Sequence, residues 1–210
     1  MLTYARSNGL RLTLFAAITT AAIAFTHLLT DAQITAAAEA SRDVRLRQLL
    51  PEGSYDNDLA ASCIRLPADP LLGPGQHQLF VARKDNHPLA LLLEVTAPNG
   101  YNGNIELLLA ADSEGHILGV EVMAHKETPG LGDKIESRRS NWLMSFIGRT
   151  LDEGNAKTFA VKRDDGDFDQ FSGATITPRA VVAAVANALI YLKREQGSLS
   201  LARPNCGDKP

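Results

Sequence analysis

The chain has 210 residues, of which 45% are hydrophobic and 21% charged, and its formal net charge at pH 7 is −3. These proportions are typical of a folded globular protein and suit one domain with an appendage. No basic tract or basic–aromatic patch is present, which argues against nucleic acid as a partner. The two cysteines and five histidines are scattered, so no residue cluster suggests a metal site.

Residues 12–29 carry no charged side chain, and this length approaches the roughly 17–25 residues that a helix needs to cross a bilayer. Arg6 and Arg11 precede the apolar run and Asp31 follows it, so we expect a cytoplasmic N-terminus, with most of the chain on the other side of the membrane. The alternative is a signal peptide cleaved near Ala38-Glu39-Ala40, although such peptides usually have an apolar core of only about 7–15 residues.

The sequence predicts four parts in chain order: an N-terminus and membrane anchor (1–30), a helical stalk and loop (31–75), a globular domain (76–200) and a polar tail (201–210). The stalk is rich in alanine and is expected to be solvated, with Pro51 ending its helix. Its arginines are the alternative contact for lipid headgroups. Cys63 and Cys206 would be exported with the domain, which permits a disulfide between them, but the sequence does not decide it.

Four short strand-like runs open the globular domain, at residues 78–83, 88–96, 104–111 and 117–124. The gaps between them are rich in turn residues, and Asn102-Gly103 and Glu114-Gly115 can supply the positive φ values of tight turns. This pattern predicts an antiparallel meander.

Residues 133–146 show helical periodicity, and the predicted inner face consists of Ile135, Trp142, Leu143 and Phe146. Residues 158–162 are the candidate for one further strand. The fold class is therefore predicted to be α+β, with a twisted antiparallel sheet and helices packed on it. Without a GxGxxG or P-loop motif, nothing indicates a nucleotide-dependent dehydrogenase or an NTPase.

A loop with the sequence His-Lys-Glu-Thr-Pro-Gly-Leu-Gly-Asp-Lys lies at residues 125–134, between a predicted strand and a predicted helix. Rigid scaffolds often present functional residues on such loops. On sequence grounds alone, a plain strand-to-helix turn capped by Asp133 explains the segment equally well.

The segment Asp-Gln-Phe-Ser-Gly-Ala-Thr-Ile-Thr-Pro, residues 169–178, predicts the start of an amphipathic helix that runs to about residue 195. Thr177 is the expected N-cap and Pro178 the expected first helical residue. Ser172, Gly173 and Ala174 are small and leave the backbone accessible. The hydroxyl of Thr175 would then lie beside a helix N-terminus, which attracts phosphate groups.

The spacing Asp-x-x-Ser-Gly-Ala-Thr resembles the flavinylation motif in which an ApbE-type flavin transferase joins the phosphate of FMN to the final threonine, here Thr175. Together with the 125–134 loop and the N-terminal anchor, it makes the chain similar to the RnfG family, the flavin-carrying component of the Rnf electron-transport complex. The related NqrC family, from the sodium-pumping NADH:quinone reductase, carries a similar Glu-Thr-Pro-Gly-Leu-Gly loop and is the nearest alternative.

The resemblance implies a single-pass protein of the bacterial inner membrane whose extracytoplasmic domain carries covalent FMN. It would relay electrons among the other subunits of the complex rather than act as a complete enzyme. Glu127 and Thr128 would contact the flavin or its ribityl chain, while Gly130 and Leu131 would supply a close backbone and an apolar wall. Two other kinds of protein stay open: a flavin-free membrane-anchored assembly or sensing module, and a secreted module that binds FMN without a covalent bond.

The charge and aromatic content near the motif add further expectations. Lys162 or Arg179 could offset the negative charge of the phosphodiester. Asp169 could position the loop or engage the transferase. The side chains that could stack on the flavin ring are Trp142, Phe146 and Phe168.

Overall fold

The computed structural model describes residues 2–51, 53–152, 154–199 and 202–206. They belong to two compact units, Met1–Arg42 and Asp43–Pro210. Helix α1 (Leu2–Gln48) supplies the first unit and the opening residues of the second.

The first unit has the properties of a membrane-spanning helix. Its stretch Asn8–Ile34 has a mean hydropathy of 1.8, and none of it is buried within the protein. The hydroxyls of Thr13, Thr19, Thr26 and Thr30 each donate to a carbonyl one turn earlier in the helix. These polar groups are therefore satisfied within the helix, as a bilayer requires.

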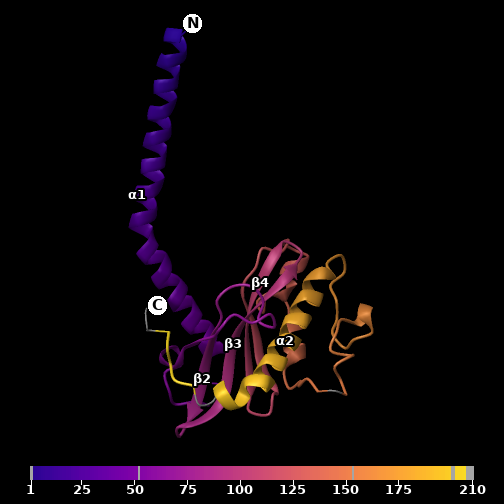
Figure 1. Ribbon diagram of the computed structural model, residues 1–210. Coiled ribbons are helices and arrows are strands. Elements are labelled where there is room, and N and C mark those ends of the chain that lie inside the picture. Colours follow the sequence, from indigo (N-terminus) through magenta and orange to yellow (C-terminus); the bar gives the residue numbers. More distant parts are fainter. Residues whose placement is uncertain (1, 52, 153, 200–201, 207–210) are drawn as a thin grey trace. The chain divides into compact units, whose positions relative to one another are not determined.

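The second unit is built on a five-stranded antiparallel sheet in the order β1-β2-β3-β4-β5 (Figure 1). The strands are β1 (Ile64–Arg65), β2 (Gln78–Lys84), β3 (His87–Gly100), β4 (Gly103–Asp112) and β5 (Ile117–Ala124). Positive φ angles occur in the hairpin turns at Asp85, Asn86, Gly103 and Gly115. The predicted α+β class and meander are confirmed, whereas the short edge strand β1 was not predicted.

Both faces of the sheet are covered, because alternate residues of a strand point to opposite sides. On one face, Leu91 and Leu93 of β3 belong to the same apolar cluster as Val181 and Val185 of helix α2 (Ile176–Leu199). On the other face, Leu92 shares a cluster with Leu46, near the end of α1. Helix α2 is long and apolar enough to resemble a membrane span, but its 61% burial identifies it as a core helix.

The single helix predicted for residues 133–146 is wrong. The segment forms two short 3-10 helices, η2 (Gly132–Ile135) and η3 (Trp142–Phe146), separated by extended backbone at Glu136. The helical periodicity was nevertheless informative, because Ile135, Trp142, Leu143 and Phe146 are all buried. Glu136 leaves the helical path because its carboxylate is held by His125, whose Nε2 lies 2.8 Å from Oε1, and by Arg138.

The strand predicted for residues 158–162 is also wrong. Residues 154–160 form turns and bends, Val161 makes an isolated bridge to Phe168, and the 3-10 helix η4 (Lys162–Asp164) follows. Asp165 has a φ of 60°, and a Cβ on Gly166 would lie only 2.0 Å from the carbonyl oxygen of Ala160. Such a tight reversal prevents the chain from continuing as a strand.

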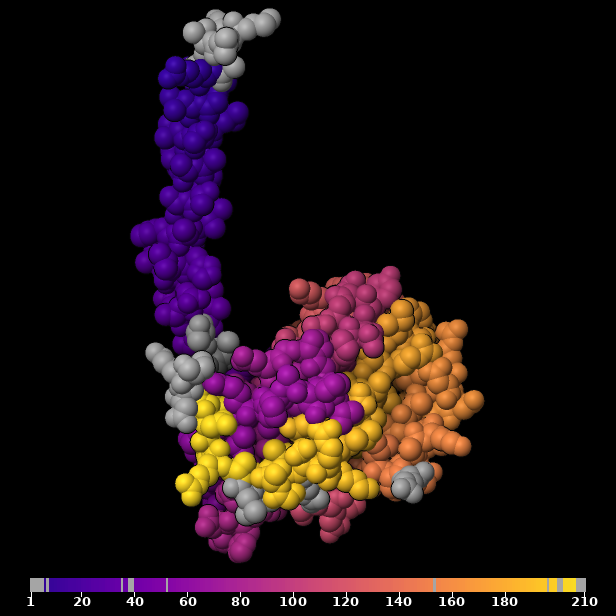
Figure 2. Space-filling model, in the orientation of Figure 1, coloured from indigo at the N-terminus to yellow at the C-terminus, as the bar shows by residue number. Residues whose placement is uncertain are grey.

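A cluster of aromatic side chains supports the segment that precedes α2. The rings of Phe146 and Phe168 stack with their centroids 4.4 Å apart, and Trp142 packs edge-on against Phe146 and Phe171. The indole Nε1 of Trp142 donates to the carbonyl of Asp169 over 2.8 Å. The aromatic core therefore fixes the start of the 169–175 loop. Figure 2 shows the neighbouring segment around residues 155–170, in orange, beside the gold surface of α2.

Cys63 and Cys206 form a disulfide that links positions 143 residues apart in the sequence. Around it, the amide of Asn205 donates to the carbonyl of Cys63 over 3.0 Å, and the side-chain oxygen of Asn205 accepts the amide of Arg65 at 2.6 Å. The C-terminal tail is thereby joined to strand β1.

Candidate functional site

The two sequence motifs meet at one pocket of about 260 Å³. The pocket lies between the β3–β4 hairpin, the loop after β5 and the start of α2. Its lining residues are Tyr101, Glu127, Thr128, Leu131, Gly132, Gly173, Ala174, Thr175, Ile176 and Thr177. Tertiary folding thus brings together most of the residues that were predicted from two separate stretches of sequence.

Thr177 does not cap α2, contrary to the prediction. The helix starts at Ile176, and the carbonyl of Thr175 accepts the early helical N–H of Arg179 at 3.3 Å. The side chain of Thr177 is 1% exposed and donates its hydroxyl hydrogen to Oε2 of Glu127. Thr177 already lies inside the helix, and its hydroxyl serves instead as a donor to the buried carboxylate, which needs such donors.

Glu127 is the centre of the buried side of the pocket. Its second carboxylate oxygen, Oε1, accepts the backbone N–H of Asn102 at 3.0 Å, and its own N–H donates to Nδ1 of His125. These bonds and the one from Thr177 join the hairpin, the 125–134 loop and α2. The carboxylate thus fixes the shape of the pocket from three directions.

The close packing around this carboxylate explains why position 132 of the 125–134 loop is a glycine. A Cβ atom there would lie 2.8 Å from both Oε2 of Glu127 and Oγ1 of Thr177, which is closer than real Cβ contacts. Glycine at position 130 is explained by its backbone instead, because a φ of 79° favours glycine. A Cβ atom there would have no neighbour within 4 Å.

Thr175 lines the same pocket and is less buried than Glu127 and Thr177. Its side chain is half-buried, and Ser172 and Gly173 just before it are exposed. Gly173 has a φ of 79° and the amide of Ala174 donates to the carbonyl of Phe171, so the backbone turns sharply ahead of Thr175. The small side chains leave room around its hydroxyl, which is the group that could act as a nucleophile.

Three predicted residues do not line this pocket, as far as the described residues define it: Gly130, Ser172 and Lys162. Lys162 instead pairs through Nζ with Oδ1 of Asp169 at 2.6 Å. Asp169 is therefore held by this ion pair and by the indole of Trp142, which supports its expected role in positioning the loop.

Arg179, the other residue expected to offset the phosphodiester charge, is also paired with a carboxylate. Its guanidinium bonds both oxygens of Asp164, at 2.6 and 2.7 Å, and lowers the pKa of that carboxyl group. Arg163, which was not among the predicted residues, contacts Thr175 instead, with Nη1 3.5 Å from Oγ1.

The aromatic side chains at the pocket are also different from those expected. Trp142, Phe146 and Phe168 belong to the core and do not line the pocket. Tyr101 and Ile176 line the pocket instead. Tyr101 is 65% exposed and Ile176 is 46% exposed. The sequence feature that could have indicated Tyr101 as a pocket residue is its position, because a large aromatic residue directly precedes the Asn102-Gly103 turn.

The 125–134 loop is held from outside the pocket by a small charged network. Arg138 holds the pKa of Glu136 down to about 2, with a further contribution from His125. Arg139 lies 3.0 Å from Oδ2 of Asp133, a carboxylate that is only 3% exposed. The network links the loop to the turn that follows it.

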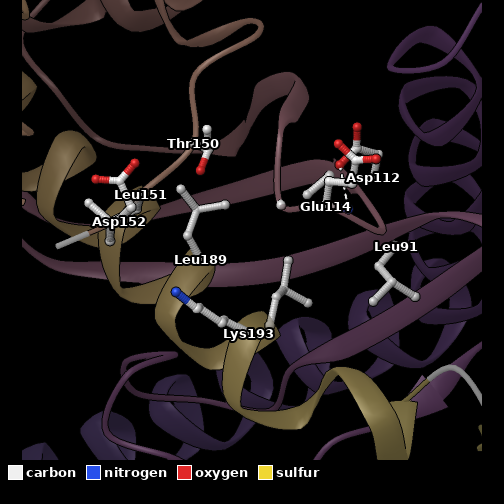
Figure 3. Close-up of a pocket in the computed structure, with 11 residues that line it drawn as sticks. Leu91, Asp112, Glu114, Thr150, Leu151, Asp152, Leu189 and Lys193 are labelled. Atoms are coloured by element: carbon white, nitrogen blue, oxygen red, sulfur yellow. Dashed lines mark hydrogen bonds between the residues drawn. The ribbon is translucent and has the colours of Figure 1, made fainter. Parts of the chain in front are cut away.

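A second pocket, of about 300 Å³, lies near the other end of α2 (Figure 3). Leu91, Leu151, Leu189 and Leu192 give it apolar walls, and Asp112, Glu114, Asp152 and Lys193 are its charged residues. It contains no residue of either motif among those described. The pocket at Thr175 is therefore the candidate site.

Comparison with known proteins identifies the family to which the chain belongs. Residues 100–190 match the FMN-binding domain family, and residues 1–49 match the RnfG N-terminal region. The chain is 46% identical to the G component of the ion-translocating oxidoreductase complex of Cronobacter sakazakii, with 100% of both chains covered. It is 46% identical to the same component from Escherichia coli K12, covering 99% of this chain and 100% of the relative. With that of Salmonella typhi, the identity is 49% over 91% of this chain and 92% of the relative. The chain therefore belongs to the RnfG family of ion-translocating oxidoreductase complex subunits.

Proposed function

We propose that this protein is the FMN-carrying subunit of an Rnf-type complex, with FMN joined through its phosphate to Oγ1 of Thr175. It relays electrons between other subunits of that complex. Its family membership and the FMN-binding domain match support the cofactor and the partners. The choice of Thr175 is carried by one observation: it is a half-buried threonine, directly after small residues, in a pocket that both sequence motifs line.

The other threonines of the pocket are less suitable for attachment. The hydroxyl of Thr177 is buried and already bonded to Glu127. Thr128 is half-buried like Thr175, but its neighbours Glu127 and Pro129 are bulkier than the residues that precede Thr175. Only Thr175 follows the Ser-Gly-Ala sequence whose small side chains give another protein access to the hydroxyl.

The residues of the pocket fit an aromatic ring with polar edges. Tyr101, Leu131 and Ile176 offer apolar surface, while Thr128 and Glu127 offer polar atoms on one side. The volume of about 260 Å³ is slightly below the roughly 300–1,000 Å³ of typical ligand pockets, so part of FMN would stay outside. A partly exposed flavin suits a relay, because the groups that exchange electrons with it must come close.

FMN supplies the redox chemistry, since a flavin can accept and release electrons one or two at a time. The protein holds and orients it. Attachment forms a bond between Oγ1 of Thr175 and the flavin phosphorus. The donor is a flavin phosphoanhydride, whose P–O bond breaks as the leaving phosphate takes the electron pair, and the hydroxyl proton passes to a base. The proposed catalyst is an ApbE-type flavin transferase, which approaches over Ser172 and Gly173.

We also propose that the flavin domain lies on the extracytoplasmic side of the inner membrane. Arg6 and Arg11 precede the apolar stretch of α1, in the order expected for a cytoplasmic N-terminus. The disulfide between Cys63 and Cys206 supports an oxidising compartment, because cytosolic thiols are normally kept reduced.

The proposal is tested by producing the full-length protein with and without an ApbE-type transferase and separating the membrane fraction on a denaturing gel. A fluorescent flavin band at the mass of this protein is expected only with the transferase. If the band is absent while the same transferase labels a second substrate, covalent attachment is wrong. Flavin that is released on denaturation would then favour non-covalent binding.

A further inference from the structure

Three cationic residues lie in η4 and at the start of α2, and their side chains have different partners. Lys162 pairs with Asp169, and Arg179 makes two bonds to Asp164. Arg163, which lies between Lys162 and Asp164 in η4, directs Nη1 to within 3.5 Å of Oγ1 of Thr175. This is the long limit of a hydrogen bond to a neutral hydroxyl.

The backbone around Arg163 is fixed independently of Thr175. Its amide donates to the side-chain oxygen of Gln170 at 3.2 Å. On either side, Val161 bridges to the fully buried Phe168, and Asp165 reverses the chain with a φ of 60°. The guanidinium is therefore presented from a short turn that is attached to the aromatic core, and it faces the residue proposed to carry the flavin.

We propose that Arg163 binds the phosphate that joins FMN to Thr175 and so acts as the positioning residue of the cofactor. This inference rests on the proposed function. Esterification replaces the hydroxyl hydrogen with a phosphodiester, which carries one negative charge at the place that Nη1 already approaches. Guanidinium–phosphate contacts are charge-assisted and often bidentate, so they are stronger than the long contact to the hydroxyl.

The contact has a consequence for the flavin. A single ester bond leaves free rotation about the bonds between the threonine backbone and the phosphate. A second attachment at the phosphate removes much of that freedom and keeps the ring in its pocket. Lys162 and Arg179 are less able to do this, because each would first have to give up a carboxylate that it bonds directly, whereas Arg163 acts on Asp164 only through its charge.

The test uses the full-length protein flavinylated at Thr175, as the parent and as Arg163→Gln, Arg163→Lys and Lys162→Gln. For each protein, the ³¹P resonance of the phosphodiester and the decay of the flavin fluorescence anisotropy are measured on the flavinylated fraction. Arg163→Gln should shift the ³¹P resonance and add a fast component to the anisotropy decay. Arg163→Lys should restore part of both. Lys162→Gln should change both less than Arg163→Gln does, because its ion pair with Asp169 acts on the loop and not on the phosphate.

The inference is wrong if Arg163→Gln retains the resonance and the anisotropy decay of the parent. It is equally wrong if Lys162→Gln changes both as much as Arg163→Gln does. A parent protein that carries no covalent flavin overturns the proposed function and this inference together. The state of the parent therefore separates the two failures.

Discussion

Two threonines at the start of α2, only two residues apart, have opposite environments. Thr177 is 1% exposed, and its hydroxyl is bonded to the buried carboxylate of Glu127. Thr175 is half-buried, and Nη1 of Arg163 lies 3.5 Å from its hydroxyl oxygen. The comparison shows that a hydroxyl inside a closed polar network contributes to stability, whereas one at the edge of a pocket is available for chemistry.

The same difference separates the aromatic side chains of this region. Trp142 and Phe146 pack in the core below the 169–175 loop. Tyr101 is 65% exposed at the pocket. Substitutions should therefore divide into those that lower the free energy of unfolding and those that change the flavin while leaving stability almost unaltered.

The largest effect on stability is expected for Thr177→Ala. The substitution leaves Oε2 of Glu127 without its donor in a buried place, which costs roughly 1–3 kcal/mol of unfolding free energy. Urea unfolding monitored by circular dichroism measures the change, and Thr177→Ser is the control because it keeps the hydroxyl. An unfolding midpoint equal to that of the parent would show that the Thr177–Glu127 bond contributes nothing.

A smaller loss is expected for Trp142→Phe, which removes the indole donor to the carbonyl of Asp169. One neutral hydrogen bond contributes about 0.5–1.5 kcal/mol, and the smaller ring adds a packing defect. Met144→Leu in the same 3-10 helix is the control, because that side chain is 62% exposed. Equal unfolding free energies for the two variants would contradict the role of Trp142 in fixing the loop.

Tyr101→Leu should change the flavin more than the fold. Substitutions at exposed positions usually alter stability by less than about 0.5 kcal/mol, and Tyr101 is mostly exposed. Loss of the ring should raise the fluorescence of the attached flavin, since a neighbouring tyrosine quenches it, while the matched variant Tyr101→Phe preserves an aromatic surface. Identical flavin spectra in the parent and Tyr101→Leu would remove Tyr101 from the site.

The smallest effect concerns acid stability and Glu136. Arg138 and His125 lower the pKa of Glu136 from 4.5 to about 2 in the folded protein. Its contribution to stability is therefore present above about pH 4.5 and is lost as the pH falls toward 2. Glu136→Gln should show a shallower loss of unfolding free energy across this window. The difference should shrink in high salt, because the Arg138 side chain is 76% exposed. Equal slopes for both proteins at low salt would contradict the assignment.

The sequence predicted those parts of the fold that depend on local pattern. The alternation in β2 to β5 and the turns at Asn102-Gly103 and Glu114-Gly115 were sufficient for the meander. The helix at residues 133–146 failed because Glu136 is drawn out of the helical path by His125, which lies eleven residues earlier. The helical periodicity correctly predicted which side chains of that segment are buried, but it contains no information on the contact between His125 and Glu136.

The candidate site shows the same limit. Both motifs could be found in the sequence, and the fold brings them to one pocket. The bond between Glu127 and Thr177 spans 50 residues, so local rules assigned the threonine to capping. The contributions of Arg163 and Tyr101 depend on the turn around η4 and on the position of the β3–β4 hairpin, neither of which follows from a residue's neighbours in the chain.

The most direct test of the central claim is the intact mass of the denatured protein, made with an active flavin transferase, for the parent, Thr175→Ala and Thr177→Ala. The parent and Thr177→Ala should each gain the mass of one FMN less one water, and the gain should map to the peptide that contains Thr175. Thr175→Ala should gain nothing while it unfolds at the same urea concentration as the parent. Covalent flavin on Thr175→Ala, or its loss from a folded Thr177→Ala, would contradict the account.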